Sequence, residues 1–427
     1  MKKFDDAFAR NCRLQFPSLL REQDGQPVVF LDGPAGTQVP RSVADAVSNY
    51  LLHYNANHAG KFSTSIETDE MLEKAFRAMA DFVGADDPKE IMFGPNMTTL
   101  TFALSRAMAR EWKAGDEVIV TAIDHDANIT PWVLAARDAG ATVHMVNFRS
   151  EDYLVDLEHL GSLLWKRTRL VAVCCASNAT GGVNPVAEIT KMAHTVGAET
   201  FLDAVHYSPH GLVDVQAWDC DWLALSTYKF FGPHLGAIWG RGDRLKEIQP
   251  YKVRPSSNEI PWRWMTGTQS HEAIAGALAC VDYMAEIGRG VAEDKRLGRR
   301  QALKVAAQAI GQYESQLVWK LIAGLQEIDG VTIYGITDPK RANDRFATVS
   351  FTMDGVPTSR LARMLADEGI FVWGGNYYAL EFTTRMGLEP EGMIRVGLVH
   401  YNLTGEVDRL LDALMRIRET ASAGATA

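Results

Sequence analysis

Two apolar, strand-like runs of this chain each end in a side chain that can do chemistry. The run Glu-Thr-Phe-Leu-Asp-Ala-Val (199–205) carries Asp203, and the run Asp-Trp-Leu-Ala-Leu-Ser (221–226) leads through Thr-Tyr to Lys229. A lysine held rigidly at a strand end can form a Schiff base with pyridoxal phosphate, and a carboxylate can keep the pyridine nitrogen of that cofactor protonated. The alternative is a partly exposed lysine that merely follows a buried strand.

A phosphate site is expected near that lysine. The segment Met-Phe-Gly-Pro-Asn-Met-Thr-Thr (92–99) runs from a short strand through a Gly-Pro turn into a helix. Free backbone N–H groups at the start of this helix, around Asn96 and Met97, can face an anion whose charge the helix dipole favours. The hydroxyls of Ser226 and Tyr228 can complete the cradle. Asn and Thr at a helix start are also common as plain caps.

Two further polar residues follow strand-like runs. His125, in Asp-His-Asp-Ala-Asn (124–128), can stack on a cofactor ring and act as an acid or base near the reacting carbon. Asn178, in Ser-Asn-Ala-Thr-Gly-Gly (177–182), can donate a hydrogen bond to the phenolate oxygen of the ring. The alternatives are a solvated histidine in a helix-capping loop and an ordinary turn asparagine.

Strands and helices alternate through the first two thirds of the chain, which predicts a mostly parallel sheet covered on both faces. Ligands bind such sheets at the carboxyl ends of the strands, where the residues named above fall. The expected strands are 28–32, 90–93, 117–123, 142–147, 170–177, 200–205, 222–226 and 237–240, and the expected helices are 42–54, 68–84, 98–112, 128–138, 156–165 and 186–196.

From about residue 271 the pattern changes to two long helices and a shorter α+β segment. We expect a large cofactor-binding α/β domain over 25–290, and a smaller α+β domain formed by 1–24 together with 291–427. The elements expected in this second part are helices 271–287, 300–328, 358–368 and 404–421, and strands 332–334, 347–351, 370–373 and 394–399.

Composition limits the function classes. The chain has 427 residues, 47% of them hydrophobic, and a net charge of −10 without a basic cluster, which argues against nucleic acid as the main partner. No run has the apolar length of a membrane span or a signal peptide, so we expect a cytoplasmic protein without a membrane partner. The five cysteines lack metal-type spacing, and the adjacent Cys174 and Cys175 are expected to be reduced core residues, so no metal site is expected.

The order of these motifs resembles the class V aminotransferases and is most similar to the cysteine desulfurase and selenocysteine lyase branch. The resemblance runs from Phe30 to Asn402. It implies the fold of pyridoxal phosphate enzymes of fold type I, with a seven-stranded type of sheet, a homodimer and an amino-acid substrate. The motifs are Asp-His-x-Ala-Asn, Ser-Asn-x-x-Gly, Leu-Asp-Ala, Ser-x-x-Lys and Arg-x-x-x-x-x-Tyr-Asn.

The resemblance implies a role for each candidate near the ring. Lys229 matches the Schiff-base lysine, Asp203 the partner of the pyridinium nitrogen, and His125 the histidine stacked on the ring. Asn178 matches the asparagine near the phenolate oxygen, and Ser226 matches a phosphate ligand.

Four more residues match positions at the edge of the site. Asn96 and Met97 lie where the phosphate-binding loop of the family lies. Thr268 matches the threonine that reaches the phosphate from the neighbouring subunit. Arg395 matches the arginine that holds the α-carboxylate of the substrate through its two-pronged guanidinium. The alternative for Arg395 is an ordinary ion pair between strands.

The chain departs from desulfurases at 372–380. Desulfurases need a cysteine on a mobile loop, whose thiolate attacks the substrate sulfur and carries a persulfide. Here the loop reads Val-Trp-Gly-Gly-Asn-Tyr-Tyr-Ala-Leu, with Tyr378 at or near the cysteine position, and no cysteine follows Cys280. A phenol cannot carry a persulfide, so ordinary cysteine desulfurase chemistry is not expected.

Other departures suggest a different substrate. His206 stands where desulfurases usually have glutamine, and Tyr228 where they usually have histidine, although both can hydrogen-bond the cofactor. Tyr377, Tyr378 and Arg385 could line the substrate side and select a bulkier or acidic side chain. The alternative is that these three residues only pack the loop.

These observations predict an enzyme that acts at Cα or Cβ of a small amino-acid substrate, as an aminotransferase or a β-elimination lyase. Lys229 would move the Cα proton, with His125 as the second catalytic residue. The alternatives are a racemase or epimerase and a non-catalytic pyridoxal phosphate-binding protein. A dinucleotide-dependent dehydrogenase is disfavoured because Asp-Gly-Pro-Ala-Gly-Thr (32–37) lacks the Gly-x-Gly-x-x-Gly turn.

Overall fold

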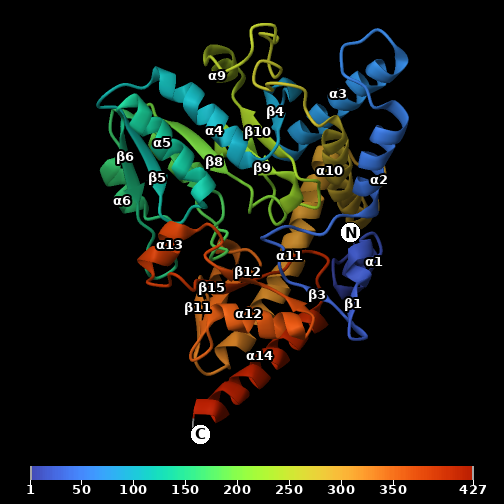
Figure 1. The fold of residues 1–427 in the computed structure, drawn as a ribbon, viewed down its shortest axis with the longest axis vertical. Helices are drawn as coiled ribbons and strands as arrows, with labels where there is room; N and C mark the ends of the chain where they lie inside the picture. Colours follow the sequence, from blue (N-terminus) through green and yellow to red (C-terminus); the bar gives the residue numbers. More distant parts are fainter. Residues whose placement is uncertain (1, 426–427) are drawn as a thin grey trace.

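Two β-sheets organise the chain. In the computed structural model, which describes residues 2–425, a seven-stranded sheet and its helices form the upper part of the view, and a four-stranded sheet forms the lower part (Figure 1). Helix α11 (Arg299–Gln326) runs from the upper part into the lower one. Helix α11 therefore joins the parts of the molecule that contain the two sheets.

The seven-stranded sheet has the order β4-β10-β9-β8-β7-β5-β6. Every neighbouring pair is parallel except those of β10, which is antiparallel to both β4 and β9. The predicted α/β class with a mostly parallel sheet is thus confirmed. The strands are β4 (Ile91–Gly94), β5 (Glu117–Thr121), β6 (Thr142–Val146), β7 (Thr168–Cys174), β8 (Glu199–Asp203), β9 (Trp222–Ser226) and β10 (Gly236–Gly240).

Helices cover both faces of this sheet, which explains why its central strands are apolar at successive positions rather than alternate ones. At the core, Trp132 and Phe201 are both completely buried, and their ring centres lie 4.9 Å apart. The helices of this part are α2 (Arg41–Asn49), α3 (Ser63–Val83), α4 (Met97–Met108), α5 (Thr130–Ala139), α6 (Leu157–Leu163), α7 (Val186–His194), α8 (Val215–Trp218), α9 (Gly242–Glu247) and α10 (His271–Ala292).

The four-stranded sheet has the order β11-β12-β15-β14 and is antiparallel throughout. The N-terminal helix α1 (Asp6–Arg13) contacts this part, because Arg13 pairs with Glu406 at 2.8 Å. The proposed domain limits stay a prediction. Further elements of this part are β11 (Val331–Tyr334), β12 (Thr348–Met353), β14 (Trp373–Gly375), β15 (Met393–Gly397), α12 (Thr358–Asp367), α13 (Leu380–Arg385) and α14 (Thr404–Ala425).

Two strand predictions need correction. The expected strand 28–32 is only β3 (Val29–Phe30), which lies outside the seven-stranded sheet and pairs with β13 (Ile370–Phe371). The expected strand 370–373 is divided, since β13 and β14 belong to different sheets. Apolar runs indicate extended backbone, but they do not say which distant strand supplies the hydrogen bonds.

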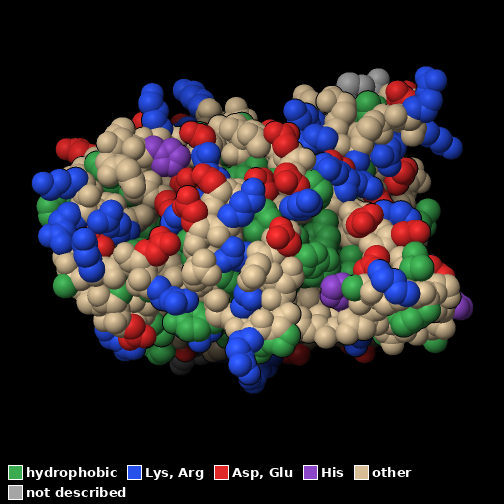
Figure 2. Space-filling view, turned by 90° about the horizontal axis from the view of Figure 1, so that it is seen from above, with side chains coloured by type: hydrophobic (Ala, Val, Ile, Leu, Met, Phe, Trp, Pro, Cys, Tyr) green, Lys and Arg blue, Asp and Glu red, His purple; other side chains and the backbone are tan. Residues whose placement is uncertain are grey.

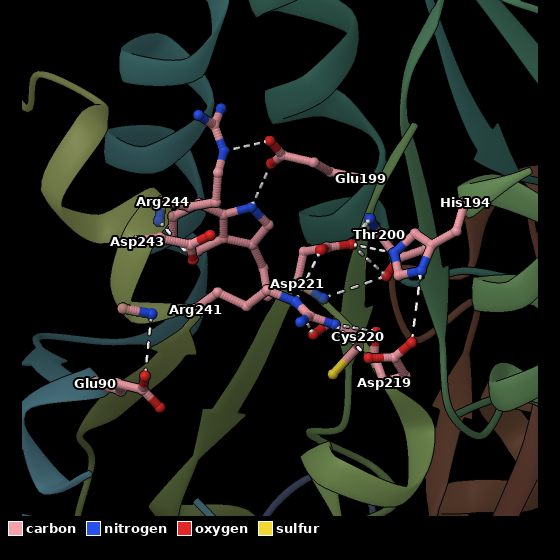
Figure 3. A network of polar contacts seen from close by, with 12 residues as sticks. Glu90, His194, Glu199, Thr200, Asp219, Cys220, Asp221, Arg241, Asp243 and Arg244 are labelled. Atoms are coloured by element: carbon pink, nitrogen blue, oxygen red, sulfur yellow. Dashed lines mark hydrogen bonds and ion pairs between the residues drawn. The ribbon is translucent and has the colours of Figure 1, made fainter. Parts of the chain in front are cut away.

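A polar network lies at the amino ends of β8 and β9 (Figure 3), whereas Asp203 is at the carboxyl end of β8. The buried carboxylate of Asp221 accepts a hydrogen bond from the backbone of Thr200 at 2.8 Å. It also lies 2.9 Å from Nε2 of His194 and 3.0 Å from Nε of Arg241. These contacts link the ends of adjacent strands and so fix the position of one strand along the next.

The distribution of charge on the surface does not indicate a particular class of binding partner. Figure 2 shows Lys and Arg side chains intermingled with Asp and Glu side chains on the face seen from above. Across residues 2–425, none of the helices combines the length and the apolar character that crossing a lipid bilayer demands. Within the same residues, no cluster of three or more histidine, cysteine or acidic side chains could hold a metal ion.

We expect Asp221→Asn to lower the free energy of unfolding by about 1–3 kcal/mol, because a buried network loses its charged acceptor. Urea denaturation followed by circular dichroism measures the change. The matched control is Asp243→Asn in the same region, where the carboxylate is exposed. Equal stability of the two variants would contradict a role for this network in holding the sheet.

Candidate active site

A cavity of about 200 Å³ lies at the carboxyl ends of β7, β8 and β9 and is also lined from the four-stranded sheet. It brings together the predicted site residues except Asn96, Thr268 and Arg385. The principal lining residues are Pro34, Ala35, Met97, Thr98, His125, Cys174, Asn178, Asp203, His206, Ser226, Tyr228, Lys229, Trp373, Tyr377, Tyr378 and Arg395.

Lys229 ends the single 3₁₀ turn that follows β9. Its amine donates hydrogen bonds to the backbone carbonyls of Pro34 and Ala35, the latter at 3.1 Å. Removal from water, together with the charge of Arg395, lowers the pKa of Lys229 to about 7. A large share of the amine is therefore neutral near pH 7, which is the form that attacks an aldehyde.

Asp203 ends β8 and is buried in the cavity wall. It accepts a hydrogen bond from the backbone of Val205 at 2.9 Å, while burial raises its pKa to about 6. The completely buried Asp124 accepts a hydrogen bond from Asn128 at 2.6 Å, and burial raises its pKa to about 7, with a smaller contribution from Asp203. The sequence analysis assigned no role to Asp124, although its place directly before His125 was a usable signal.

His125 is set at the start of a short turn, and its Nδ1 accepts a hydrogen bond from the backbone of Ala127 at 3.0 Å. The proton of the neutral ring is therefore on Nε2. Burial, Lys229 and Arg395 lower the pKa of His125 to about 4. A neutral ring suits stacking on a cofactor and donation of one hydrogen bond more than it suits strong acid catalysis.

In the segment predicted to bind phosphate, the side chain of Asn96 and the backbone of the following residues lie in different surroundings. The side chain of Asn96 is exposed and caps α4 by accepting from the backbone of Thr99 at 2.8 Å, so this side chain fits the plain-cap alternative. Met97 and Thr98, in the first turn of α4, line the cavity. Their backbone N–H groups have no carbonyl partner within the helix and can bind an anion.

The backbone of this loop packs tightly against β10. A Cβ atom on Gly236 would lie 2.4 Å from the carbonyl carbon of Asn96 and 2.6 Å from the nitrogen of Met97. Only glycine allows this approach without a shift of the loop. The loop is thus positioned by direct contact with the sheet.

Arg395 comes from β15 and is 3% exposed. Its Nη1 donates to the carbonyl of Asn178 at 3.0 Å, and its guanidinium carbon lies 4.2 Å from the centre of the Tyr377 ring. Its Nε has no hydrogen-bond partner among residues 2–425, and no carboxylate of those residues lies within 4.0 Å. Among the described residues Arg395 therefore forms no ion pair between strands, and a buried cation of this kind can bind an anion.

The segment 372–380, here called the tyrosine loop, is held at its tip by hydrogen bonds. Tyr377 and Tyr378 have positive φ angles of 54° and 60°. The side-chain amide of Asn178 donates to the carbonyl of Tyr377 at 2.9 Å, and the backbone of Asp126 donates to that of Tyr378 at 2.8 Å. The ring of Tyr378 is stacked 5.2 Å from the ring of His125. The loop is thereby attached to the seven-stranded part of the molecule.

Two predicted positions lie elsewhere. Thr268 is exposed and does not line the cavity of its own chain. Arg385 ends α13, bonds Asn147 and lies 3.6 Å from Glu381, outside the cavity lining. The hypothesis that Arg385 lines the substrate side is wrong, because α13 directs it toward the β6 edge instead.

The donor set fits pyridoxal phosphate. A lysine amine of lowered pKa, a buried carboxylate and the first turn of a helix surround one cavity. In addition, Nε2 of His206 and Nε of Arg395 are buried without partners among residues 2–425. Unpaired buried polar atoms require a partner, and a polar ligand supplies it.

This fold and this site define a pyridoxal phosphate-dependent enzyme, and the chain belongs to the class V aminotransferases. The profile of that family, described as "Aminotransferase class-V", matches residues 29–410. The chain is similar to a probable cysteine desulfurase of Synechocystis sp. (strain ATCC 27184 / PCC 6803 / Kazusa), with 31% identity over 96% of this chain and 95% of the relative.

Solved structures share the fold. The apo structure of cysteine desulfurase from Thermococcus onnurineus NA1 has a TM-score of 0.85 and 25% identity, over 98% of this chain and 99% of that one. C-DES, solved as a variant with glycine covalently linked to its PLP cofactor, has a TM-score of 0.76 and 21% identity, over 94% and 98% of the two chains. The family and the cofactor predicted from the motifs are thus confirmed.

The lowered pKa of Lys229 predicts how the cofactor-free protein captures pyridoxal phosphate. We expect the capture rate to rise with pH through about 7, where half of the amine is neutral, and to level off only above about pH 8, where nearly all of the amine is neutral. Stopped-flow absorbance over about pH 5.5–9 measures this rate. Binding of pyridoxamine phosphate, which cannot form the Schiff base, is the control. A rate that climbs in proportion to hydroxide up to pH 9 would mean an ordinary lysine.

The contact at Gly236 predicts a second effect. We expect Gly236→Ala to weaken cofactor affinity at least about tenfold, equal to about 1.4 kcal/mol, because the phosphate loop must shift. Titration of the cofactor-free protein gives the dissociation constant. Gly405→Ala is the control, since no atom lies within 4 Å of an added Cβ there. Equal affinity of both variants would show that the loop position does not matter.

Proposed function

We propose that this enzyme acts at Cα or Cβ of an amino acid, as an aminotransferase or a β-elimination lyase, without a persulfide. The observation that carries the proposal is the tyrosine loop, which is fixed by hydrogen bonds from Asn178 and Asp126 and holds tyrosine at the cavity mouth. Tyr378 is 71% exposed, and its phenol cannot carry sulfur. A fixed loop also suits a reaction that needs no sulfur delivery outside the cavity.

The cysteine of the cavity wall supports the same conclusion. Among the described lining residues, Cys174 is the one thiol, and it is buried at the end of β7. Burial, and then Asp124 and Asp203, raise the pKa of this thiol well above its ordinary value. The attacking form of cysteine is the thiolate, so Cys174 is suited to packing rather than to attack on a substrate.

The residues divide the catalytic work. Arg395 binds the α-carboxylate of the substrate and so orients the Cα–H bond. With the cofactor bound, Lys229 would take the proton from Cα, because its own pKa lies near neutrality. Asp203 would hold a proton at the pyridine nitrogen of the cofactor. Bound pyridoxal phosphate supplies the electron sink for the charge left on Cα.

We also infer a homodimer, in which the exposed Thr268 reaches the phosphate site of the partner. The exposed apolar side chains of Leu51, Leu52 and Phe62 support an interface with a second subunit. The five cysteines are all free and buried, which supports a cytoplasmic location. The division into 25–290 and 1–24 with 291–427 belongs to this proposal, with the cavity between the two parts.

A substrate panel tests the reaction type. We expect L- or D-amino acids of one class to bleach the visible absorption of the bound cofactor and to yield a keto acid or pyruvate. Lys229→Ala should lose that absorption and reduce turnover by about 10²–10⁴-fold, the usual contribution of a general base. Arg395→Gln should chiefly raise KM. Sulfide or persulfide formed from cysteine at an enzymatic rate would overturn the proposal, and reversal of stereochemistry without keto acid would identify a racemase.

A further inference from the structure

Trp373 lines the cavity beside Arg395, and the mechanism above does not use it. Strands β14 and β15 pair in antiparallel fashion, with Trp373 directly opposite Arg395. Side chains of directly opposite residues lie on the same face of a sheet, with Cβ atoms about 5 Å apart. The indole is therefore the immediate neighbour of the group that receives the α-carboxylate.

The other sides of Arg395 are closed by protein. Ser350 stands opposite it on β12, is completely buried and donates a hydrogen bond to the carbonyl of Ala179 at 2.5 Å. The ring of Tyr377, which is 6% exposed, lies 4.2 Å from the guanidinium carbon. Trp373 is 49% exposed instead, and β14 is the last strand of its sheet. The open side of the carboxylate receptor is thus the side of the indole.

The chemistry of an amino acid places its side chain near this open side. The carboxylate, the amino group and the side chain are all attached to one carbon. When Arg395 binds the carboxylate, the amino group has to face the position of Lys229, where the bond to the cofactor forms. The substrate side chain is left to contact the part of the wall that neither group occupies.

That part of the wall offers no counter-charge for a charged side chain. Among the described lining residues, the cations are Lys229 and Arg395 and the carboxylate is Asp203, and all three already have a role. Burial lowers the pKa of both histidines in the wall, so their rings are neutral. Arg385 lies outside the cavity lining. A charge buried here without a partner is unfavourable.

Aromatic surface borders the cavity at its mouth. Tyr378 is 71% exposed, and its ring is stacked on that of His125, with centres 5.2 Å apart. Together with the half-exposed Trp373, it presents apolar area to water at the edge of the cavity. A ligand with an apolar side chain buries this area, and an aromatic ring gains further from its packing geometry.

We infer that the substrate is an amino acid with an uncharged, apolar side chain, aromatic ones above all, and that Trp373 selects it. The inference rests on the proposed function, because it takes Arg395 as the receptor of the α-carboxylate. It also divides the two classes predicted from the sequence. The bulkier side chain is retained, whereas the acidic one loses the cation that Arg385 was expected to supply.

Carboxylates without an amino group isolate this contact, because they cannot form a Schiff base. 3-Phenylpropanoate carries a carboxylate and an aromatic ring, propanoate carries the carboxylate alone, and glutarate carries a second carboxylate. Titration calorimetry of the cofactor-loaded enzyme gives the three dissociation constants. We expect 3-phenylpropanoate to bind at least about tenfold more tightly than either of the others.

Variants assign the preference to the indole. Trp373→Ala should abolish the preference for the aromatic ligand, and Trp373→Phe should retain it, whereas Arg395→Gln should weaken the binding of all three carboxylates. Trp165→Ala is the matched control, since Trp165 is 40% exposed and lies outside the cavity lining. It should leave the three dissociation constants unchanged.

The outcomes separate this inference from the proposed reaction. Tighter binding of glutarate than of 3-phenylpropanoate by the wild-type enzyme would overturn the inference, as would a preference that persists in Trp373→Ala. A change of oligomeric state in Trp373→Ala, seen by sedimentation, with the preference intact would place the indole at a subunit contact and also overturn it. In each case amino-acid turnover leaves the proposed function standing. Absence of turnover with every amino acid would overturn the proposed function instead.

Discussion

Removal of charged groups from water is the constraint on which the rest of this structure depends. Lys229, Arg395 and Asp203 share one cavity. Desolvation lowers the pKa of the two cations and raises that of the carboxyl group, which in each case favours the neutral form. The amine becomes a nucleophile for this reason, and the guanidinium has Asp32 as a nearby counter-charge but forms no direct ion pair with it. Holding such groups in place requires rigid supports, and the two sheets supply them. The network around Asp221 strengthens one of those sheets at the amino ends of two strands.

The tyrosine loop shows how the same constraint shapes the entrance. Two successive residues with positive φ are unusual outside glycine, and each costs roughly 1–3 kcal/mol unless the surroundings enforce it. Here the enforcement comes from backbone and side-chain hydrogen bonds, and from the contact of Arg395 with Tyr377. These contacts attach the loop 372–380 to the wall of the cavity.

Local pattern was sufficient for the parts of the site that lie at strand ends. Asp203, Ser226 and Lys229 follow apolar runs, and parallel strands deliver such residues to one edge. The pairing of β3 with β13 could not be predicted in this way, because it depends on contacts between residues distant in the chain. The same holds for Arg385, whose direction is set by α13, and for Glu314, which reaches His210 from α11. The resemblance placed Arg395 correctly in the cavity, although no local periodicity distinguishes it.

The carbonyls of Pro34 and Ala35 hold the free amine of Lys229 near its working position. Cofactor loading therefore exchanges one set of hydrogen bonds for another, and the lysine does not have to be ordered from a disordered state. Much of the entropic cost of organising this side chain is met during folding. The empty protein is therefore an acceptor whose lysine is already in place for the cofactor.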